Sequence, residues 1–476
     1  MSIAGPLLEP LDLPAGPVDL LGDTLLEERA GDRHFLEMAR GIAGLPGACL
    51  LLSGGGLDCS RYSLAGWDPL LVFSAKGRQL NLAAGPRTWR GQGHPLAVLD
   101  QLFQELRPGF PLLAEPFAGG GLGYLAYELK NQIERLPQSA QDDLGLPDIY
   151  LSFPSQVLIH DRRAGHLRHL RLGWPGRRPT GPGPQELAVL QPGPPPRLGE
   201  MTSTFSHQDY LAAVQRIRAY IAQGDVYQVN LSQRFSFGLE GDPLALWERL
   251  FAKNPAPFYA YVNAGDHQVL CTSMERFLLR RGSYLETRPI KGTRPRGADP
   301  QTDEALRREL IQSLKDDAEL SMIVDLLRND LGRVCPPRSI AVASHKRVEA
   351  FQNVFHLVST VTGQVDQGLT HGQLLSATFP GGSITGCPKI RAMEIIDELE
   401  PKVRQVYTGS IGYLGWHQNL DLNIAIRTGI VSQGHCHFAV GGGVVHDSDP
   451  EDEYQETLHK GRTLFQVMQA LGKDQP

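Results

Sequence analysis

The sequence predicts an α+β protein with more than one structural unit. Its 476 residues exceed what one ordinary core holds, so two domains, or one large fused domain, are expected. Segments of alternating apolar residues, typical of strands, are mixed with segments of helical apolar spacing. Residues 174–203 are crowded with proline and glycine and predict an exposed connector. The predicted domains are therefore residues 15–173 and residues 204–470.

The bulk composition argues against several classes of protein. The chain is 41% hydrophobic with a formal net charge of −6, so neither nucleic acid nor an anionic membrane surface is an expected partner. No apolar run reaches the roughly 20 residues that span a bilayer, and the first ten residues lack the features of a signal peptide. The six cysteines form no CxxC pair. We therefore expect reduced thiols and a cytoplasmic protein.

The N-terminal half predicts short strands joined by glycine-rich segments. Strands are expected at residues 48–53, 60–66 and 69–73. The glycine cluster at residues 119–123 is followed by no P-loop lysine at the required spacing. Close backbone packing is therefore the preferred interpretation of this cluster.

The half after the connector predicts longer elements. Ser206 and Asp209 match a capping box that begins a helix ending at Gly224. Residues 226–237 alternate as a strand whose polar face is either solvated or lines a pocket. Long helices are predicted at residues 302–331 and 450–471. Further strands and one glycine turn are predicted at residues 258–262, 269–273, 284–290, 407–414 and 422–430 and at 441–443.

One lysine stands out in the stiff segment of residues 286–297. Lys291 has Arg288, Arg294 and Arg296 as sequence neighbours. Neighbouring cations disfavour the ammonium form of a lysine, and an uncharged amine is the better nucleophile. The pattern alone also fits an ordinary solvated loop, because a lysine head group prefers water.

Two pairs of acidic residues occur at helical i, i+3 spacing. Asp316 and Glu319 share one face of the first long helix, and Glu453 and Glu456 share one face of the closing helix. Either pair alone fits a solvated face. If the helices face each other, a divalent cation must separate the charges, and Mg²⁺ suits because it prefers oxygen ligands. The substrate would then be anionic.

Several long motifs carry a resemblance to a known family. They are Ala222-Gln-Gly-Asp-Val-Tyr-Gln-Val-Asn-Leu231, Glu319-Leu-Ser-Met-Ile-Val-Asp-Leu-Leu-Arg-Asn-Asp330, Phe379-Pro-Gly-Gly-Ser-Ile-Thr-Gly386, Ile424-Ala-Ile-Arg-Thr428, and Gly441-Gly-Gly-Val-Val445 with Glu453-Tyr-Gln-Glu456. Residues 204–465 thereby resemble the chorismate-utilising enzymes, which include the large subunits of anthranilate and aminodeoxychorismate synthases and the isochorismate and salicylate synthases. The resemblance implies large, mostly antiparallel sheets packed between helices, an anthranilate synthase component I-like fold.

Two positions discriminate within that family. Gln228 stands where isochorismate-forming members are expected to carry a lysine that activates water. Lys291 stands where anthranilate synthases usually have alanine, which is typical of members that form 4-amino-4-deoxychorismate for 4-aminobenzoate and folate biosynthesis. We expect that activity, with ammonia as co-substrate. Anthranilate synthase component I and a non-catalytic subunit that binds an aromatic ligand remain alternatives.

The resemblance also implies roles for individual residues. Lys291 would add to the ring of chorismate, and Glu275 would protonate the departing C4 hydroxyl as general acid. Mg²⁺ would be held by Glu319 and Glu456, with Asp316 and Glu453 arranging its waters. The residues implied to hold the substrate are Arg427, Tyr407, Ser383, Thr293, His356 and the backbone of Gly441, Gly442 and Gly443.

Two further partners follow from the resemblance. No cysteine lies in the Gly-x-Cys-x-Gly elbow of a glutamine-hydrolysing domain, so a separate glutamine amidotransferase subunit is expected to supply ammonia. A pocket that binds tryptophan in related large subunits is also implied, with ordinary packing between domains as the alternative. Its matching positions here are Ser53, Ser60, Arg61, Tyr62, Ser63, Pro257, Phe258 and Tyr259.

Overall fold

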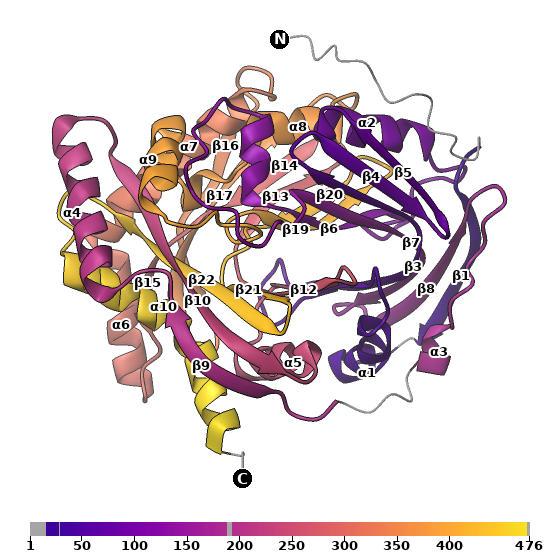
Figure 1. Cartoon of the computed structure of the whole chain (residues 1–476), viewed down its shortest axis with the longest axis horizontal. Helices are drawn as coiled ribbons and strands as arrows, with labels where there is room; N and C mark the ends of the chain where they lie inside the picture. Colours follow the sequence, from indigo (N-terminus) through magenta and orange to yellow (C-terminus); the bar gives the residue numbers. More distant parts are fainter. Residues whose placement is uncertain (1–15, 28, 188–192, 474–476) are drawn as a thin grey trace.

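The structure, a computed structural model, is organised around a continuous network of paired strands with helices outside it (Figure 1). It describes residues 16–27, 29–187 and 193–473. Pairings between the named strands are antiparallel throughout these residues, including the long ladders β3–β7 and β10–β22. Helices α4, α9 and α10 cover one side of the molecule, and α1, α2 and α3 lie at the other. This arrangement confirms the predicted α+β fold.

The elements have the following bounds within the described residues. The strands of the first half are β1 Asp19–Glu27, β2 Cys49–Leu52, β3 Tyr62–Lys76, β4 Gln79–Ala84, β5 Arg87–Gln92, β6 Gly120–Leu125, β7 Ile149–Asp161, β8 His166–Gly173 and β9 Arg197–Ser203. Those of the second half are β10 Gln228–Glu240, β11 Phe258–Asn263, β12 His267–Ser273, β13 Arg276–Arg281, β14 Tyr284–Arg288, β15 Ile290–Pro295, β16 Ala341–Ala350, β17 Val354–Gln364, β18 Gly386–Cys387, β19 Ser410–Gly415, β20 Leu420–Asn423, β21 Thr428–Ser432 and β22 His435–Val444. The helices are α1 Asp32–Ala43, α2 Pro95–Glu105, α3 Pro184–Leu187, α4 His207–Gln223, α5 Pro243–Lys253, α6 Pro300–Gln312, α7 Leu314–Gly332, α8 His371–Thr378, α9 Lys389–Leu399 and α10 Pro450–Lys473, with 3₁₀ turns η1 Tyr127–Gln132 and η2 Gly382–Ile384.

Strands from the two halves pair directly with each other. β2 pairs with β11, and β6 pairs with β19. The glycines of β6 permit this contact, since a Cβ on Gly120 would meet the Leu414 carbonyl oxygen at 2.1 Å. The expected close backbone packing at this cluster is therefore confirmed. The domain division at residues 174–203 stays a prediction, and residues 15 and 188–192 lie outside the described residues.

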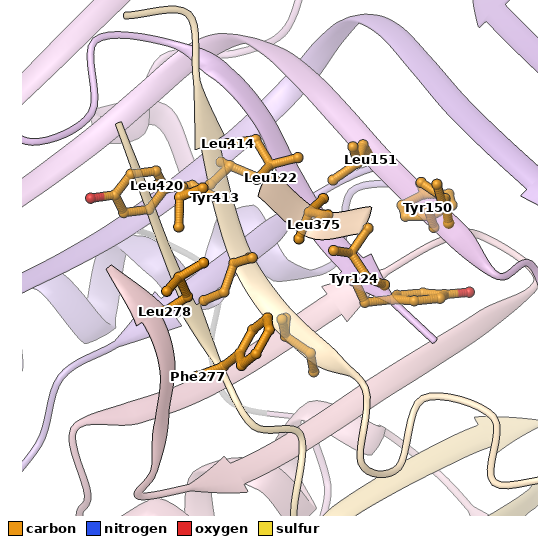
Figure 2. Packing of buried hydrophobic residues seen from close by; sticks show 14 of the residues in the cluster. Leu122, Tyr124, Tyr150, Leu151, Phe277, Leu278, Leu375, Tyr413, Leu414 and Leu420 are labelled. Atoms are coloured by element: carbon orange, nitrogen blue, oxygen red, sulfur yellow. The ribbon is translucent and has the colours of Figure 1, made fainter. Parts of the chain in front are cut away.

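The hydrophobic core also draws on both halves. Figure 2 shows Leu122, Tyr124 and Leu151 packed close to side chains that follow the connector in sequence. Those later side chains include Phe277, Leu278, Tyr413 and Leu414. Each large apolar side chain that is fully buried contributes about 1.5–3 kcal/mol. The strands that carry the candidate site residues are thus held by a core common to both halves.

Four local predictions are wrong. The strand predicted at residues 422–430 is two strands, β20 and β21, with residues 424–427 between them. The long helix predicted at residues 302–331 is two helices, α6 and α7, because Ser313 caps a new helix by accepting a hydrogen bond from the Asp316 N–H at 3.3 Å. The strands predicted at residues 60–66 and 69–73 are one strand, β3, with a register shift between Pro69 and Leu71 that follows the positive φ of Asp68, 54°. The glycine turn predicted at residues 441–443 lies inside β22 instead. The helix predicted after Ser206 is confirmed as α4, with the Ser206 side chain as its cap.

Candidate active site

Lys291 is aimed by an irregularity in β15. Gly292, with φ 69°, is the extra residue between the pairs that β15 forms with β17. A Cβ on Gly292 would lie 3.0 Å from the Asp316 side chain of α7, so glycine also permits this close approach. Across the site, a Cβ on Gly443 would lie 3.5 Å from Lys291 Nζ. The amine therefore points toward β22.

The arginines near Lys291 in sequence are neutralised by other residues. Each forms an ion pair at 2.6 Å: Arg288 with Asp58, Arg294 with Glu309 and Arg296 with Asp303. The expectation that free guanidinium groups crowd Lys291 is therefore wrong, because these side chains pair with acidic residues outside residues 286–297. Lys291 lies near carboxyl groups instead. It opposes the rise that burial causes in the pKa values of Glu275 and Glu319, and it adds to the lowering that Lys460 causes in the pKa of Glu456.

Acidic residues of α7 and α10 approach the same region. A Cβ on Gly442 of β22 would lie 3.1 Å from Glu453 Oε2 and 3.5 Å from Glu456 Oε1. Burial raises the pKa of Glu319 on α7, and the nearby Asp316 and Glu456 charges raise it further. Burial also raises the pKa of Glu453. The structure thus brings both predicted acidic pairs to one region, although Asp316 is also ion-paired with Arg294 at 3.3 Å.

The donor set fits a hard divalent cation in charge and chemistry. Glu453 is buried, and its Oε2 has no hydrogen-bond partner among the described residues. Such an atom is costly unless a ligand satisfies it. No three His, Cys, Asp or Glu side chains in the described part of the chain are already gathered into a metal-binding group. Carboxylate oxygens are nevertheless the ligands that Mg²⁺ prefers.

Sequence reasoning missed Lys460 of α10. Its Nζ lies 2.7 Å from Glu456 Oε1 and donates a hydrogen bond to the Gly441 carbonyl oxygen at 2.8 Å. This lysine is the largest cause of the lowered pKa of Glu456. Its i, i+4 spacing from Glu456 was a signal in the sequence, because residues so spaced share a helix face.

Glu275 is a buried carboxyl group beside Lys291. It follows β12, and its carbonyl oxygen accepts a hydrogen bond from the Ile424 N–H at 3.0 Å. Burial raises the pKa of Glu275 to about 7, although Ser383 and Lys291 oppose that effect. The hydroxyl of Ser383, predicted to hold the substrate, donates a hydrogen bond to Glu275 Oε1 at 2.6 Å. A carboxyl group that keeps its proton near neutral pH can act as a general acid.

Arg427 offers a partly buried positive charge. It lies between β20 and β21 with φ 51°, an uncommon conformation for a residue other than glycine. Its guanidinium makes no ion pair or hydrogen bond among the described residues, and burial lowers its pKa. The segment that carries Tyr407 lies alongside, since the Thr408 N–H donates to the Ala425 carbonyl oxygen at 2.9 Å. An unpaired guanidinium in such a place is suited to an anion.

Two more buried side chains have free polar atoms. His356 Nδ1 lies 3.0 Å from Thr293 Oγ1 and 3.2 Å from the Gly292 carbonyl oxygen, which only accepts. Nδ1 therefore carries the proton, and the bare Nε2 has no partner among the described residues. Burial, with a smaller effect of Arg427, lowers the pKa of His356 to about 4, so the ring is neutral at pH 7. Gln228 is fully buried, and neither of its amide atoms has a partner among the described residues.

The predicted glycine segment forms part of a strand edge. Gly441, Gly442 and Gly443 pair with β10 on one side. β21 pairs with the other side of β22 only as far as Ala439. The second edge at these glycines is therefore not covered by β21.

Six of the eight residues predicted for the tryptophan pocket line one cavity of about 270 Å³. They are Ser53, Arg61, Tyr62, Pro257, Phe258 and Tyr259. Ser60 donates instead to the Gly54 carbonyl oxygen at 2.8 Å, and Ser63 Oγ accepts from the Ser53 N–H at 3.1 Å. We call this space the Ser53 cavity. Its charged lining residues include Arg276, Glu286, Arg288 and Asp421.

Comparison with known proteins identifies the family. The family of chorismate binding enzymes matches residues 48–466. Aminodeoxychorismate synthase component 1 of Salmonella typhimurium is 40% identical over 439 residues, which cover 89% of this chain and 94% of the relative. Anthranilate synthase component 1 of Cereibacter sphaeroides is 37% identical over 440 residues, 88% of each chain. The crystal structure of anthranilate synthase component I from Streptococcus pneumoniae matches with a TM-score of 0.75 and 28% identity, over 86% of this chain and 93% of that one. With a match from residue 48 to residue 466, the chain belongs to the chorismate binding enzyme family.

Proposed function

We propose that this chain is an aminodeoxychorismate synthase component I, which converts chorismate and ammonia into 4-amino-4-deoxychorismate. The observation that carries the proposal is the position of Lys291, whose amine faces β22 and lies near the carboxyl groups of Glu275, Glu319 and Glu456. A lysine can attack the diene of the ring, whereas an alanine at this position has no such chemistry.

In the proposed first step, the uncharged amine of Lys291 forms a bond to C2 of the ring. The ring double bonds shift and the C4–O bond breaks. Glu275 donates its proton to the departing hydroxyl, which leaves as water. Its raised pKa supports this role, because a carboxyl group ionised throughout the neutral range would have no proton to give.

In the second step, ammonia forms a bond to C4, the double bonds shift back and the C2–N bond to Lys291 breaks. The amine regains its electron pair, and one proton of the added ammonia returns to the site. The sum is chorismate plus ammonia giving 4-amino-4-deoxychorismate plus water. Arg427 holds the enolpyruvyl carboxylate in this scheme, with Tyr407 and the open backbone edge at Gly441–Gly443 beside it.

The proposed cofactor is Mg²⁺. Glu319 and Glu456 would hold the ion, with Asp316 and Glu453 beside it. The Oε2 atom of Glu453, which has no hydrogen-bond partner among the described residues, supports a cation site here. The bound ion would engage the ring carboxylate and draw electron density toward it. The protein's own contribution is to keep these acids close together until the ion and the substrate arrive.

Ammonia would come from a separate glutamine amidotransferase subunit in the cytoplasm. The numbering of the relative as a component 1 supports a partner subunit for that protein. In the described residues no helix is long and apolar enough to cross a membrane. The isolated chain is expected to accept free ammonium salt in place of the partner.

The deciding experiment uses chorismate and Mg²⁺ without ammonia, followed by intact-mass measurement. The expected result is a covalent adduct that maps to Lys291 and disappears in Lys291→Ala. Added ammonium salt should then release 4-amino-4-deoxychorismate from the wild-type protein. An unmodified protein that makes no product under both conditions would contradict the proposal.

The second candidate is anthranilate synthase component I, which the 37% identity to the Cereibacter sphaeroides protein favours. The products separate the two activities, because the anthranilate reaction also releases pyruvate. Fluorescent anthranilate with one equivalent of pyruvate from the purified chain would select this alternative.

We also propose that the Ser53 cavity takes tryptophan, as a structural ligand or an inhibitor. Six of the eight residues implied by the sequence line it, which supports the assignment. Native mass spectrometry of the purified chain, before and after dialysis against tryptophan, tests it. No bound tryptophan after dialysis would leave ordinary packing as the explanation.

A further inference from the structure

We propose that Ser383 is a positioning residue that orients the carboxyl group of Glu275 and stabilises the carboxylate left after proton transfer, an inference that rests on the proposed function. The sequence implied a different role, in which this hydroxyl holds the substrate. The two roles make different demands on one proton, so they can be separated.

The contact between the two side chains is short and dry. Ser383 Oγ donates to Glu275 Oε1 at 2.6 Å, and the two residues are only 6% and 5% exposed. A serine hydroxyl has one proton to donate. While the Ser383 hydroxyl donates its hydrogen bond to Glu275, it has no second proton to donate to a substrate oxygen.

The loop that carries Ser383 holds the hydroxyl in place. Arg404 donates to the Ile384 carbonyl oxygen at 3.0 Å, and it is itself fixed by a buried ion pair with Glu400 at 2.6 Å. The Ser383 hydroxyl therefore sits on a rigid support.

The backbone of Glu275 is fixed as well. Its N–H donates to Ser273 Oγ at 3.2 Å, and its carbonyl oxygen accepts from Ile424. The remaining freedom is rotation of the side chain, and Ser383 is the side chain that restrains it through a hydrogen bond. The charged groups that face the carboxyl are Lys291 on β15 and Lys460 on α10, beside the backbone of Ile290.

The hydrogen bond also becomes stronger during the reaction. As Glu275 gives up its proton, a neutral acceptor becomes an anion, and hydrogen bonds to ions are about twice as strong as neutral ones. Ser383 therefore favours the ionised form of Glu275 and lowers its pKa against the larger effect of burial. Loss of the hydroxyl should both misorient the acid and make it a weaker one.

The test compares Ser383→Ala with Ser383→Thr, which keeps a hydroxyl, and with Thr385→Val, which removes a hydroxyl from the same loop. The pH profile of kcat/KM is measured with chorismate, Mg²⁺ and ammonium salt. Ser383→Ala should move the alkaline limb to higher pH by roughly 0.5–1 unit and lower kcat roughly 10-fold. Ser383→Thr should restore both values, and Thr385→Val should leave the limb in place.

A second measurement does not depend on turnover. Difference infrared spectroscopy follows the protonated carboxyl of Glu275 through a pH titration, with Glu275→Gln as the blank. The midpoint should rise in Ser383→Ala and return in Ser383→Thr. This readout still tests the role of Ser383 if wild-type protein makes no product, an outcome that would sink the proposed function alone.

Two results would overturn the inference. One is a rise in KM for chorismate in Ser383→Ala with the pH limb and kcat unchanged, which assigns the hydroxyl to the substrate. The other is an infrared midpoint equal to that of the wild type, which shows that the hydroxyl does not act on Glu275.

Discussion

The candidate active site and the Ser53 cavity each contain an arginine, Arg427 partly buried and Arg276 buried, and the partners of the two differ. Arg276 in the cavity is ion-paired with Glu286 at 2.6 Å and with Asp421 at 2.8 Å. Arg427 in the active site has no such partner among the described residues. Tyr259 lies near both arginines. It lines the cavity with Arg276, and Arg427 opposes the rise that burial causes in the pKa of its phenol.

The same contrast extends to the neighbouring polar atoms. In the cavity, Glu286 also accepts hydrogen bonds from Tyr284 and Arg288. In the active site, Gln228 and Glu453 carry buried atoms with no partner among the described residues. A cavity whose charges satisfy one another can hold a ligand by shape, whereas a site with open partners needs its ligand to complete it. We infer that charged groups with protein partners stabilise the fold, and that charged groups without partners bind the ligand.

The largest expected effect is on stability and comes from the cavity. Arg276→Met removes the guanidinium from the buried Glu286 and the partly buried Asp421. Breaking a buried ion pair from one side costs about 3–5 kcal/mol. Urea unfolding followed by circular dichroism should show a loss of that size. A loss below about 1 kcal/mol, the range of an exposed pair, would contradict the view that this pair supports the fold.

The pH dependence of stability should separate Glu275 from the paired acids. The unfolded chain ionises this carboxyl near its ordinary pKa of 4.5, whereas the folded protein holds the proton to about pH 7. Its contribution is complete below pH 4.5 and is lost as the pH rises through about 7. Glu275→Gln should therefore match the wild type at low pH and exceed its unfolding free energy at pH 8 by up to about 3 kcal/mol.

The control for that experiment is Glu286→Gln in the cavity. The pKa of Glu286 is lowered despite its burial, because Arg276 and Arg288 face it. The stability from this residue is present above the ordinary pKa of a glutamate and is lost as the pH falls through the lower, folded pKa. The glutamine variant should therefore be less stable than the wild type at pH 8. The same sign for both variants would break the comparison.

Arg427→Met should weaken substrate binding and spare the fold. Hydrogen bonds to charged groups contribute about 1.5–3 kcal/mol, so KM for chorismate should rise roughly 10- to 150-fold. The urea midpoint should stay the same or increase, since the variant removes an unpaired charge from a partly buried place. A loss of stability comparable to that of Arg276→Met would show that Arg427 has a structural partner.

The sequence allowed prediction of features that depend on local spacing. The acids at i, i+3 share a helix face whatever the helix packs against, and the structure places both pairs on α7 and α10 as expected. Lys291 could be singled out because a short motif carries it, and β15 presents it toward β22. The antiparallel arrangement came from the family resemblance, since alternation alone does not say which strands pair.

Features that depend on distant contacts were outside its reach. The arginines beside Lys291 looked like a cluster, but Arg288 pairs with Asp58, 230 residues away. Ser383 meets Glu275 across 108 residues, which no local pattern reveals. The glycines at residues 441–443 resemble a turn, yet they lie in β22. A side chain on Gly442 would approach Glu453 and Glu456, two residues that the sequence does not place beside this strand.

The smallest effect concerns the cation and distinguishes two acidic side chains. Glu319 has no hydrogen bond or ion pair among the described residues, whereas Glu286 has several. Mn²⁺ can replace Mg²⁺ as a probe of a carboxylate site, and its binding is followed by electron paramagnetic resonance. Glu319→Gln should weaken Mn²⁺ binding at least about 10-fold, the lower range seen even for groups that only support metal ligands. Glu286→Gln should leave Mn²⁺ affinity unchanged under conditions where the variant is folded. Equal losses in the two variants would mean that the acids of α7 and α10 do not form a cation site.

The unpartnered Oε2 of Glu453 lies beside the same glycine as Glu456. Glu453→Gln should therefore weaken Mn²⁺ binding as Glu319→Gln does, and not leave it unchanged as Glu286→Gln does.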